Sequence, residues 1–496
     1  MGASSGDLGK KSLLLVAANW TGTALGFLAA VLVARRLGPE AVGALGYGFG
    51  LVGVVAAVLL PGFAQAHTKR VAERRDLGRC LAAMGVIQLV LQTAMVVAVL
   101  AAIWARPGLI PPGIPLAVIY LMLGHRVATN LATTFGGALL GRQWVGSLAF
   151  VLMGSRAARL VATLFVLAWW PDVRAVAATY ALEGTLELAL GAWAVYVRRG
   201  ARPVRPDAET LRAYWAYARP LLVTSPIGLL QDSLDRVLVA RWAGLQAAGY
   251  YQVARGLWEV LGTLNAQPFN LLFARLSQLF ARRDARGDEE ARRLFTSAVD
   301  KLLFLAVPAG FLLWALRAPV IGLLYGPAFL PAQGALMIFV LAAIAQAAVN
   351  PYHFVIYALE QHARFIPVVF VRFGLYLATM VVAVPMWGGS GAATVRLLLV
   401  LVPAWVFVRW TRELAGIGVE RVTWVYAAGF GLLVLVSEGM RAALAGVDAP
   451  LAIPAAILVA TAVYAGWLRL AHAGAGAHLR YARGLVWPPG WAGRGS

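Results

Sequence analysis

The strongest constraint on this chain is a repeated pattern of apolar blocks, each about 20–25 residues long. A helix of that length crosses the ~30 Å hydrocarbon layer of a bilayer. The sequence lacks the alternation of a transmembrane β-barrel, and helices satisfy their own backbone hydrogen bonds in lipid. Composition agrees, since 61% of the 496 residues are hydrophobic and only 13% are charged. We therefore predict an all-α integral membrane protein.

The apolar blocks predict about fourteen transmembrane helices. We place these helices at approximately 12–34, 43–65, 80–103, 114–139, 146–170, 174–197, 220–243, 249–274, 302–324, 333–358, 366–387, 392–410, 423–445 and 451–471.

The net charge of +21 is explained by orientation in the membrane, so no nucleic-acid partner is expected. Basic residues gather in alternate loops, and cytosolic loops are the ones enriched in Lys and Arg. We predict a multi-pass protein of the cell inner (plasma) membrane with both termini cytosolic. The longer cytosolic loops are Arg198–Arg219 and Arg275–Lys301, and the second predicts a polar helix on the membrane surface. Both loops suit anionic lipid or, alternatively, a pyrophosphate head group.

An internal repeat divides the chain. Val33–Gly43 matches Val239–Gly249 at an offset of 206 residues, with Val, Ala, Arg, Gly, Ala and Gly recurring in register. Six predicted helices separate the copies, so both halves enter the membrane in the same direction. Such a parallel duplication places two lobes around an axis normal to the membrane, with a site between them. The predicted parts are an N-terminal six-helix lobe (1–197), a cytosolic linker (198–219), a C-terminal six-helix lobe (220–410), two additional helices (411–471) and a basic cytosolic tail (472–496).

The first copy of the repeat carries a family resemblance. Ala34–Gly43 resembles the "A-R-x-L-G-p-e-x-y-G" hairpin of polysaccharide and O-antigen flippases, which belong to the multidrug, oligosaccharidyl-lipid and polysaccharide (MOP) exporter superfamily. Asp235–Leu238 with Gly249–Tyr251 resembles a second block of the family, and Leu324–Gly326 a third. The resemblance covers about residues 10–410. Val42 departs from the pattern, which often has an aromatic residue there.

The resemblance implies two six-helix lobes around a central cavity that opens alternately to either side. The implied cargo is a polyprenyl-pyrophosphate-linked oligosaccharide of the O-antigen or exopolysaccharide repeat-unit type, moved from the cytosolic to the outer leaflet. Its partners would be this lipid-linked substrate, membrane lipids and, as candidates, a glycan polymerase or other export components. Lipid II flippases of the superfamily carry cations in the first helix, and residues 12–34 have none. This difference counts against a peptidoglycan precursor as the cargo.

Charged residues inside the predicted helices need a partner or a purpose, because each costs several kcal/mol in lipid. Helical spacing of three or four residues predicts local ion pairs for Asp232 with Arg236, Arg255 with Glu259, and Glu438 with Arg441. A second set lies at similar depth on two neighbouring helices and either forms pairs across the hairpin or faces the cavity: Arg156, Arg159, Glu183 and Glu187.

Arg126 is different, because it lies near the middle of its helix with no acidic residue within one turn. His125 beside it is expected to be a packed neighbour. Guanidinium groups bind phosphate bidentately, so we predict that Arg126, supported by Arg255 and Arg236, forms the substrate-binding cations of the cavity. Asp235 is a candidate for ion coupling.

Two alternatives remain open at this level. An ion-coupled drug or cation antiporter of the same superfamily would use membrane-embedded acids such as Asp235. An enzyme is disfavoured, because there is no large external loop and no nucleotide or metal motif, and we assign no catalytic residue, metal or cofactor.

Cys80, the single cysteine, excludes intramolecular disulfides. Arg372 and Arg396 lie near helix ends and could reach the interface.

Overall fold

The computed structural model describes residues 5–59, 62–202, 204–282, 284–361, 364–444 and 449–471. Within these ranges the chain is helical, and it contains no β-strand. The predicted basic tail, 472–496, lies outside the described residues.

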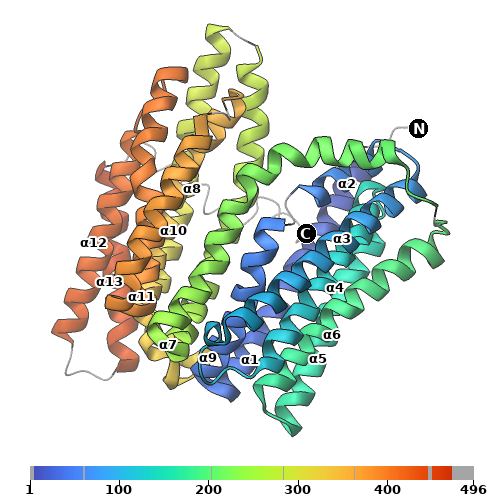
Figure 1. Ribbon diagram of the computed structural model, residues 1–496. Helices are drawn as coiled ribbons and strands as arrows, with labels where there is room; N and C mark the ends of the chain where they lie inside the picture. Colours follow the sequence, from blue (N-terminus) through green and yellow to red (C-terminus); the bar gives the residue numbers. More distant parts are fainter. Residues whose placement is uncertain are drawn as a thin grey trace, which may run out of the picture. The chain divides into compact units, whose positions relative to one another are not determined.

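Three of the long helices are each two helices joined at a glycine. These are α1 (Ser5–Leu59), α7 (Ala208–Phe280) and α11 (Phe365–Ala415), shown in Figure 1. Their joints are Gly38 (φ 78°), Gly244 (φ 91°) and Gly388 (φ 55°). A positive φ favours glycine because a Cβ would clash with the backbone. Gly38 and Gly244 are 206 residues apart, so the joint recurs at the repeat offset.

The remaining helices follow the predicted order, and most of them begin and end within a few residues of the predicted bounds. The exception is the helix predicted at 302–324, because α8 begins at Ala285 and ends at Ala315. The longer ones are α3 (Leu77–Ala105), α4 (Leu116–Gly141), α5 (Val145–Trp169), α6 (Val173–Ala192), α8 (Ala285–Ala315), α10 (Gln333–Ala358), α12 (Arg421–Ala443) and α13 (Ala449–Ala471). Short elements are α2 (Phe63–Ala72), α9 (Arg317–Tyr325), the 3-10 helices η1 (Pro107–Leu109) and η3 (Pro327–Ala332), and the π-helix η2 (Trp193–Arg198). Eight described helices satisfy a strict length and hydropathy test for spanning a membrane. Two of these contain a glycine joint and count as two segments each, which gives ten. Helices α4 and α6 and the two halves of α7 add four, so the described helices agree with the predicted number of about fourteen.

The two long loops are more helical than predicted. Helix α7 begins at Ala208, inside the segment predicted as a linker, because its first turns have an apolar face to bury. Tyr214 and Ala218 pack in one core cluster with Phe63 and Met84. Residues 285–301 are not a separate surface helix; they form the first turns of α8, which continues without a break to Ala315.

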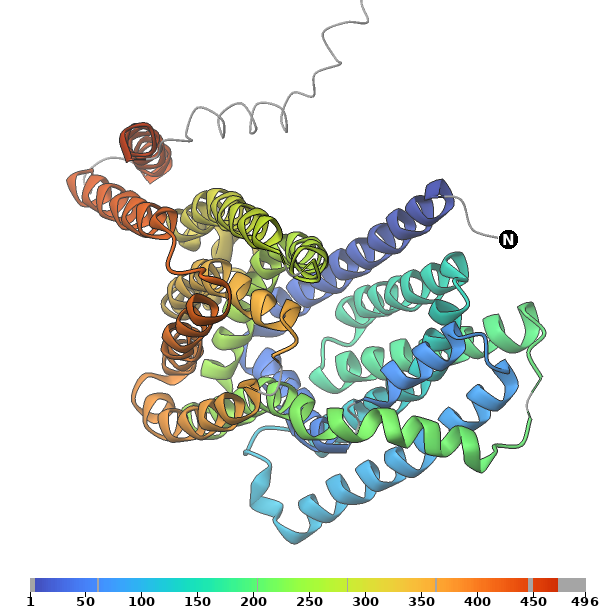
Figure 2. The ribbon, with the colours of Figure 1, turned by 90° about the horizontal axis from the view of Figure 1, so that it is seen from above.

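The chain forms two compact units, which we describe separately. Unit 1 comprises Met1–Gln252, Leu324–Phe329 and Met380–Ala392, and unit 2 comprises Val253–Leu323, Leu330–Thr379 and Ala393–Ser496. In unit 1, α4, α5 and α6 lie side by side, and α1 packs on α5 (Figure 1). In unit 2, α12 packs against both α8 and α13, as the view in Figure 2 shows. The six-helix lobes proposed from the sequence remain a prediction.

The two copies of the repeated hairpin meet inside unit 1 through equivalent residues. A Cβ on Gly43 would overlap the carbonyl oxygen of Leu245, and a Cβ on Gly249 would overlap that of Pro39. Gly43 and Gly249 are repeat equivalents, as are Pro39 and Leu245, so the contact is reciprocal. Reciprocity of this kind is the property of a two-fold interface. The close backbone approach requires a residue without a side chain at both positions.

Candidate functional site

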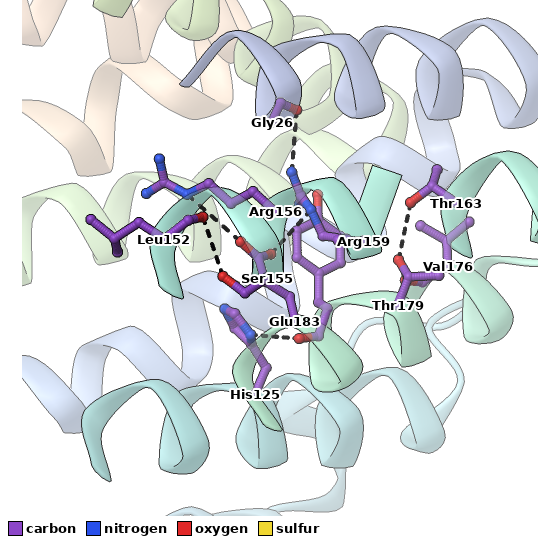
Figure 3. A network of polar contacts seen from close by, with 11 residues as sticks. Gly26, His125, Leu152, Ser155, Arg156, Arg159, Thr163, Val176, Thr179 and Glu183 are labelled. Atoms are coloured by element: carbon purple, nitrogen blue, oxygen red, sulfur yellow. Dashed lines mark hydrogen bonds and ion pairs between the residues drawn. The ribbon is translucent and has the colours of Figure 1, made fainter. Parts of the chain in front are cut away.

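A charged network of unit 1 joins α5 and α6 to the first part of α1 (Figure 3). Arg159 Nε lies 3.0 Å from Glu183 Oε2, and Arg156 Nε lies 3.9 Å from Glu183 Oε1. Arg159 also donates from Nη2 to the carbonyl oxygen of Gly26 at 3.3 Å. Pairing across the helix hairpin is thus confirmed for these residues. Both ion pairs fall on Glu183, whereas the prediction shared them with Glu187.

Aromatic and backbone contacts hold this network in place. The Arg159 guanidinium lies 4.5 Å from the centre of the Tyr180 ring, a cation–π contact. The carbonyl oxygen of Tyr180 accepts a hydrogen bond from His125 Nδ1 at 2.7 Å, which fixes α4 on α6. Phe49 meets both rings edge-on, at 4.9 Å from Tyr180 and 5.7 Å from His125. His125 is therefore a packed neighbour, as predicted.

Arg126 lies outside that network. It is ten residues from the start of the 26-residue helix α4, about 15 Å along the axis at ~1.5 Å per residue. Its side chain is half-buried, and among the described residues no carboxylate oxygen lies within 4.0 Å of it. A Cβ on Gly53 would lie 3.7 Å from Arg126 Nη2 and 2.6 Å from Ser233 Oγ. The guanidinium thus lies close to Gly53 of α1 and is not neutralised by Glu183.

Asp235 and Arg236 lie on the first half of α7, also in unit 1. Asp235 is fully buried, and its Oδ2 accepts a hydrogen bond from the Tyr251 hydroxyl at 2.7 Å. Arg236 is half-buried, and its Cβ would lie 2.8 Å from a Cβ on Gly50. Arg236 therefore lies where the glycine-rich second half of α1 approaches α7, whereas the contact of Asp235 is to Tyr251 of α7 itself. The local pair expected between Asp232 and Arg236 stays a prediction.

Arg255 belongs to unit 2, on the second half of α7. Its Nε lies 2.8 Å from Glu259 Oε1, so the predicted local pair is confirmed. The Arg255 side chain is only 7% exposed, whereas that of Glu259 is 54% exposed. The arginine of this pair is therefore buried, and its carboxylate partner lies at the surface.

The pair predicted at the end of α12 is part of a larger cluster in unit 2. Glu438 lies 3.8 Å from Arg441, as the helical spacing predicted. A closer cation is Arg317 at 2.8 Å, and Trp314 Nε1 donates to the same carboxylate at 3.0 Å. Sequence reasoning missed Arg317 because 121 residues separate it from Glu438. The cluster fastens α12 to α8 and α9.

No group of three or more His, Cys, Asp or Glu residues within the described ranges could hold a metal ion. The charged groups inside the helices are mainly arginines paired with single carboxylates.

Comparison with known proteins identifies the family. A family model described as "Polysaccharide biosynthesis protein" matches residues 8–280, more than half of the chain. The chain belongs to this polysaccharide biosynthesis family. The resemblance seen in the repeated hairpin is thereby confirmed. No curated protein matches the chain.

Solved structures similar to this polysaccharide biosynthesis protein show the MOP transporter fold. The lipid II flippase MurJ, in an inward closed conformation, is 12% identical and superposes with a TM-score of 0.70 over 92% of this chain and 98% of MurJ. A multidrug resistance MATE family transporter of the MOP superfamily, in an inward-facing conformation, is 15% identical with a TM-score of 0.64 over 79% of this chain and 94% of its own. A MOP superfamily transporter from Pyrococcus furiosus is 16% identical with a TM-score of 0.54 over 82% and 96%. These relatives are transporters and a flippase, not enzymes.

Proposed function

We propose that this protein is a flippase that moves a polyprenyl-pyrophosphate-linked oligosaccharide, of the O-antigen or exopolysaccharide repeat-unit type, from the cytosolic to the outer leaflet by alternating access. The observation that carries the proposal is Arg126, a half-buried cation in the middle of a membrane helix with no carboxylate neutralising it among the described residues. Family membership and a fold shared with a lipid flippase support it.

The chemistry of the cargo explains why such a cation would be kept. A lipid pyrophosphate is anionic and cannot cross hydrocarbon unaided, whereas its polyprenyl tail is soluble there. Arginine suits the head group because its planar fork donates two hydrogen bonds to phosphate and stays charged when partly desolvated. Arg159 cannot serve in the same way while Glu183 neutralises it at 3.0 Å. In this proposal Arg126 contacts the pyrophosphate, with Arg236 and Arg255 as further cations. Arg255 differs from Arg159 because its partner Glu259 is 54% exposed and can be exchanged for the head group, whereas Glu183 is only 13% exposed.

The proposal places the protein in the inner (plasma) membrane with both termini cytosolic. Support comes from the basic residues of alternate loops, including the loop between α7 and α8.

Substitution of Arg126 tests the function. Arg126→Ala should reduce glycan export at least about tenfold, the loss expected for one charge-assisted hydrogen bond, and lipid-linked glycan should accumulate on the cytosolic leaflet. Arg126→Lys should retain part of the export because it keeps the charge. Export is compared at equal protein levels in cells that lack the native gene. Arg409→Ala is the matched control, since Arg409 is exposed and pairs locally with Glu413. Normal export by Arg126→Ala would refute the assignment.

The alternative is an ion-coupled drug or cation antiporter, and the fully buried Asp235 favours it. Transport that follows an ion gradient, is lost in Asp235→Asn, and needs no lipid-linked substrate would replace the flippase proposal with this one.

A further inference from the structure

The first turns of α7, residues 208–219, form a short amphipathic helix, which we call the surface helix. Thr210, Tyr214 and Ala218 are buried and lie one helical turn apart along one side of it. The Tyr214 hydroxyl lies 2.7 Å from His67 Nδ1 of α2 and 3.3 Å from the carbonyl oxygen of Cys80 in α3. The surface helix therefore packs on α2 and on the beginning of α3, within unit 1 (Figure 1, green, beside α2).

The surface helix lies beside the ends of the spanning helices rather than beyond them. Tyr214 and Ala218 share a core cluster with Met84, which is seven residues after the start of α3, about 10 Å along its axis at ~1.5 Å per residue. A Cβ on Gly137 would lie 2.8 Å from the His67 ring, and Gly137 is four residues before the end of α4, about 6 Å from that end. Interfacial helices lie at this depth, ~5–10 Å into the boundary between head groups and acyl chains.

The opposite side of the surface helix is exposed and carries two arginines around a tryptophan. Arg212, Trp215 and Arg219 are separated by three and four residues, so they form one stripe along the helix. Trp215 is 56% exposed, although most of its ring is apolar. Tryptophan is enriched at the membrane–water interface, where its ring meets acyl chains and its N–H meets water. The stripe therefore has the composition of a surface that contacts lipid head groups.

The charge of this stripe is not neutralised by the neighbouring acidic residues. Among the described residues, Arg212 and Arg219 form no ion pair or hydrogen bond. Asp207, the residue before the helix, accepts hydrogen bonds from the Thr210 backbone nitrogen at 2.6 Å and from the Thr210 hydroxyl at 2.9 Å, so it caps the helix. Residues 198–219 contain six arginines against two acidic residues, which leaves an excess of positive charge.

The first turns of α8, in unit 2, differ in both respects. Arg293 pairs with Glu289, and Glu290 pairs with both Arg275 and Arg282. This part of the chain, residues 275–301, contains no tryptophan. Exposed arginine alone is therefore common to both units, whereas the surface helix combines unpaired arginines with an exposed aromatic ring between them.

We propose that the surface helix binds the head groups of anionic phospholipids of the surrounding bilayer, with Arg212 and Arg219 on phosphate oxygens and Trp215 at the level where the acyl chains begin. A guanidinium fork donates two hydrogen bonds to a phosphate. Each basic residue close to an anionic leaflet strengthens attachment about fivefold, which corresponds to ~1 kcal/mol. The ligand is a lipid of the bilayer, so this surface is separate from the cargo cation proposed at Arg126.

A fluorescent label on the stripe measures this contact in the full-length protein. Ala216 is exposed on the same side of the surface helix, so Ala216→Cys in a Cys80→Ala background places one environment-sensitive label there. The label is titrated in neutral detergent with phosphatidylglycerol or with phosphatidylcholine. We expect a saturable shift of its emission to shorter wavelength with phosphatidylglycerol, and a much weaker response to phosphatidylcholine. In nanodiscs that contain phosphatidylglycerol, brominated lipid should quench the label and aqueous iodide should not.

Variants of the same labelled chain separate charge from packing. Arg212→Gln and Arg219→Gln should each raise the apparent Kd for phosphatidylglycerol about fivefold, whereas Arg212→Lys should change it little because the charge is kept. Both arginines are exposed, so the glutamine variants should fold as the original protein does. Arg293→Gln is the matched control, since it removes an exposed cation that Glu289 already neutralises, and it should leave the apparent Kd unchanged.

Three results would overturn the proposal: an equal response to both lipids, an apparent Kd that is unchanged in the two glutamine variants, or a label that iodide quenches freely in nanodiscs. The last result would place the stripe in water, where tryptophan and arginine suit a protein partner with an acidic surface. The transport function is tested separately by glycan export in cells. Since Arg212 and Arg219 have no part in that function, either proposal can fail while the other stands.

Discussion

Replacing Glu183 with glutamine tests whether the network of Figure 3 is held by charge. Glutamine keeps the size of the side chain, so the change isolates the loss of the carboxylate charge. Arg159 then stays in place with a side chain only 8% exposed and without its ion-pair partner at 3.0 Å. Removing one partner of a buried ion pair costs about 3–5 kcal/mol, because the remaining charge is uncompensated. The longer contact to Arg156, which is 32% exposed, adds little after screening.

An exposed pair in the same chain provides the matched control. Arg409 Nε lies 2.8 Å from Glu413 Oε1, but the two side chains are 61% and 49% exposed. Exposed pairs contribute about 0.2–1 kcal/mol. We therefore expect Glu183→Gln to destabilise the protein by at least about 3 kcal/mol, and Glu413→Gln by less than about 1 kcal/mol.

The assay is thermal unfolding of the purified protein in detergent at a fixed scan rate, followed by tryptophan fluorescence. The double variant Arg159→Gln/Glu183→Gln should recover part of the loss, because neither charge is then left alone, and a double-mutant cycle measures this coupling. Equal melting temperatures for Glu183→Gln and Glu413→Gln, or a cycle without coupling, would show that the network does not depend on the ion pair.

Three further predictions concern packing, pH and topology. Gly43→Ala should destabilise the protein by about 1–3 kcal/mol or more, since the added methyl would overlap a backbone carbonyl. Gly124→Ala is the control and should be neutral or stabilising, because a Cβ at Gly124 meets open space. Equal melting temperatures for the two variants would contradict the reciprocal contact. Burial lowers the pKa of His67 from 6.5 to about 4 despite its hydrogen bond to a backbone carbonyl. The folded state therefore binds fewer protons than the unfolded state, and the free energy of unfolding should fall by up to about 3 kcal/mol as the pH drops from 6.5 to 4. His67→Gln should lose this pH-dependent component, and a pH profile that is unchanged in the variant would refute the role of His67. A cysteine replacing the exposed Ala285, in a chain without Cys80, should resist an impermeant thiol reagent in intact cells and react after the cells are opened; labelling of intact cells would reverse the proposed orientation.

Much of the fold could be predicted from the sequence, because the bilayer constrains it so strongly. Apolar blocks of bilayer length fix where helices occur, and the joints at Gly38 and Gly244 recur at the repeat offset that the sequence revealed. Local ion pairs such as Arg255 with Glu259 were predictable as well. Residues four apart on a helix are neighbours in any tertiary structure. The boundaries of the loops were less predictable, since helix α8 continues through a segment that its polarity had set apart.

What only the tertiary structure decided is which distant groups meet. Glu183 takes both arginines of the neighbouring helix, and Glu438 lies closest to a cation 121 residues away. Arg372 and Arg396, which the sequence placed near helix ends, line one cavity. Helical periodicity gives the face on which a side chain lies, but it does not give the rotation and depth of one helix against another. Those depend on the packing of many side chains at once, and they determine whether a buried arginine is neutralised or remains available to an anion.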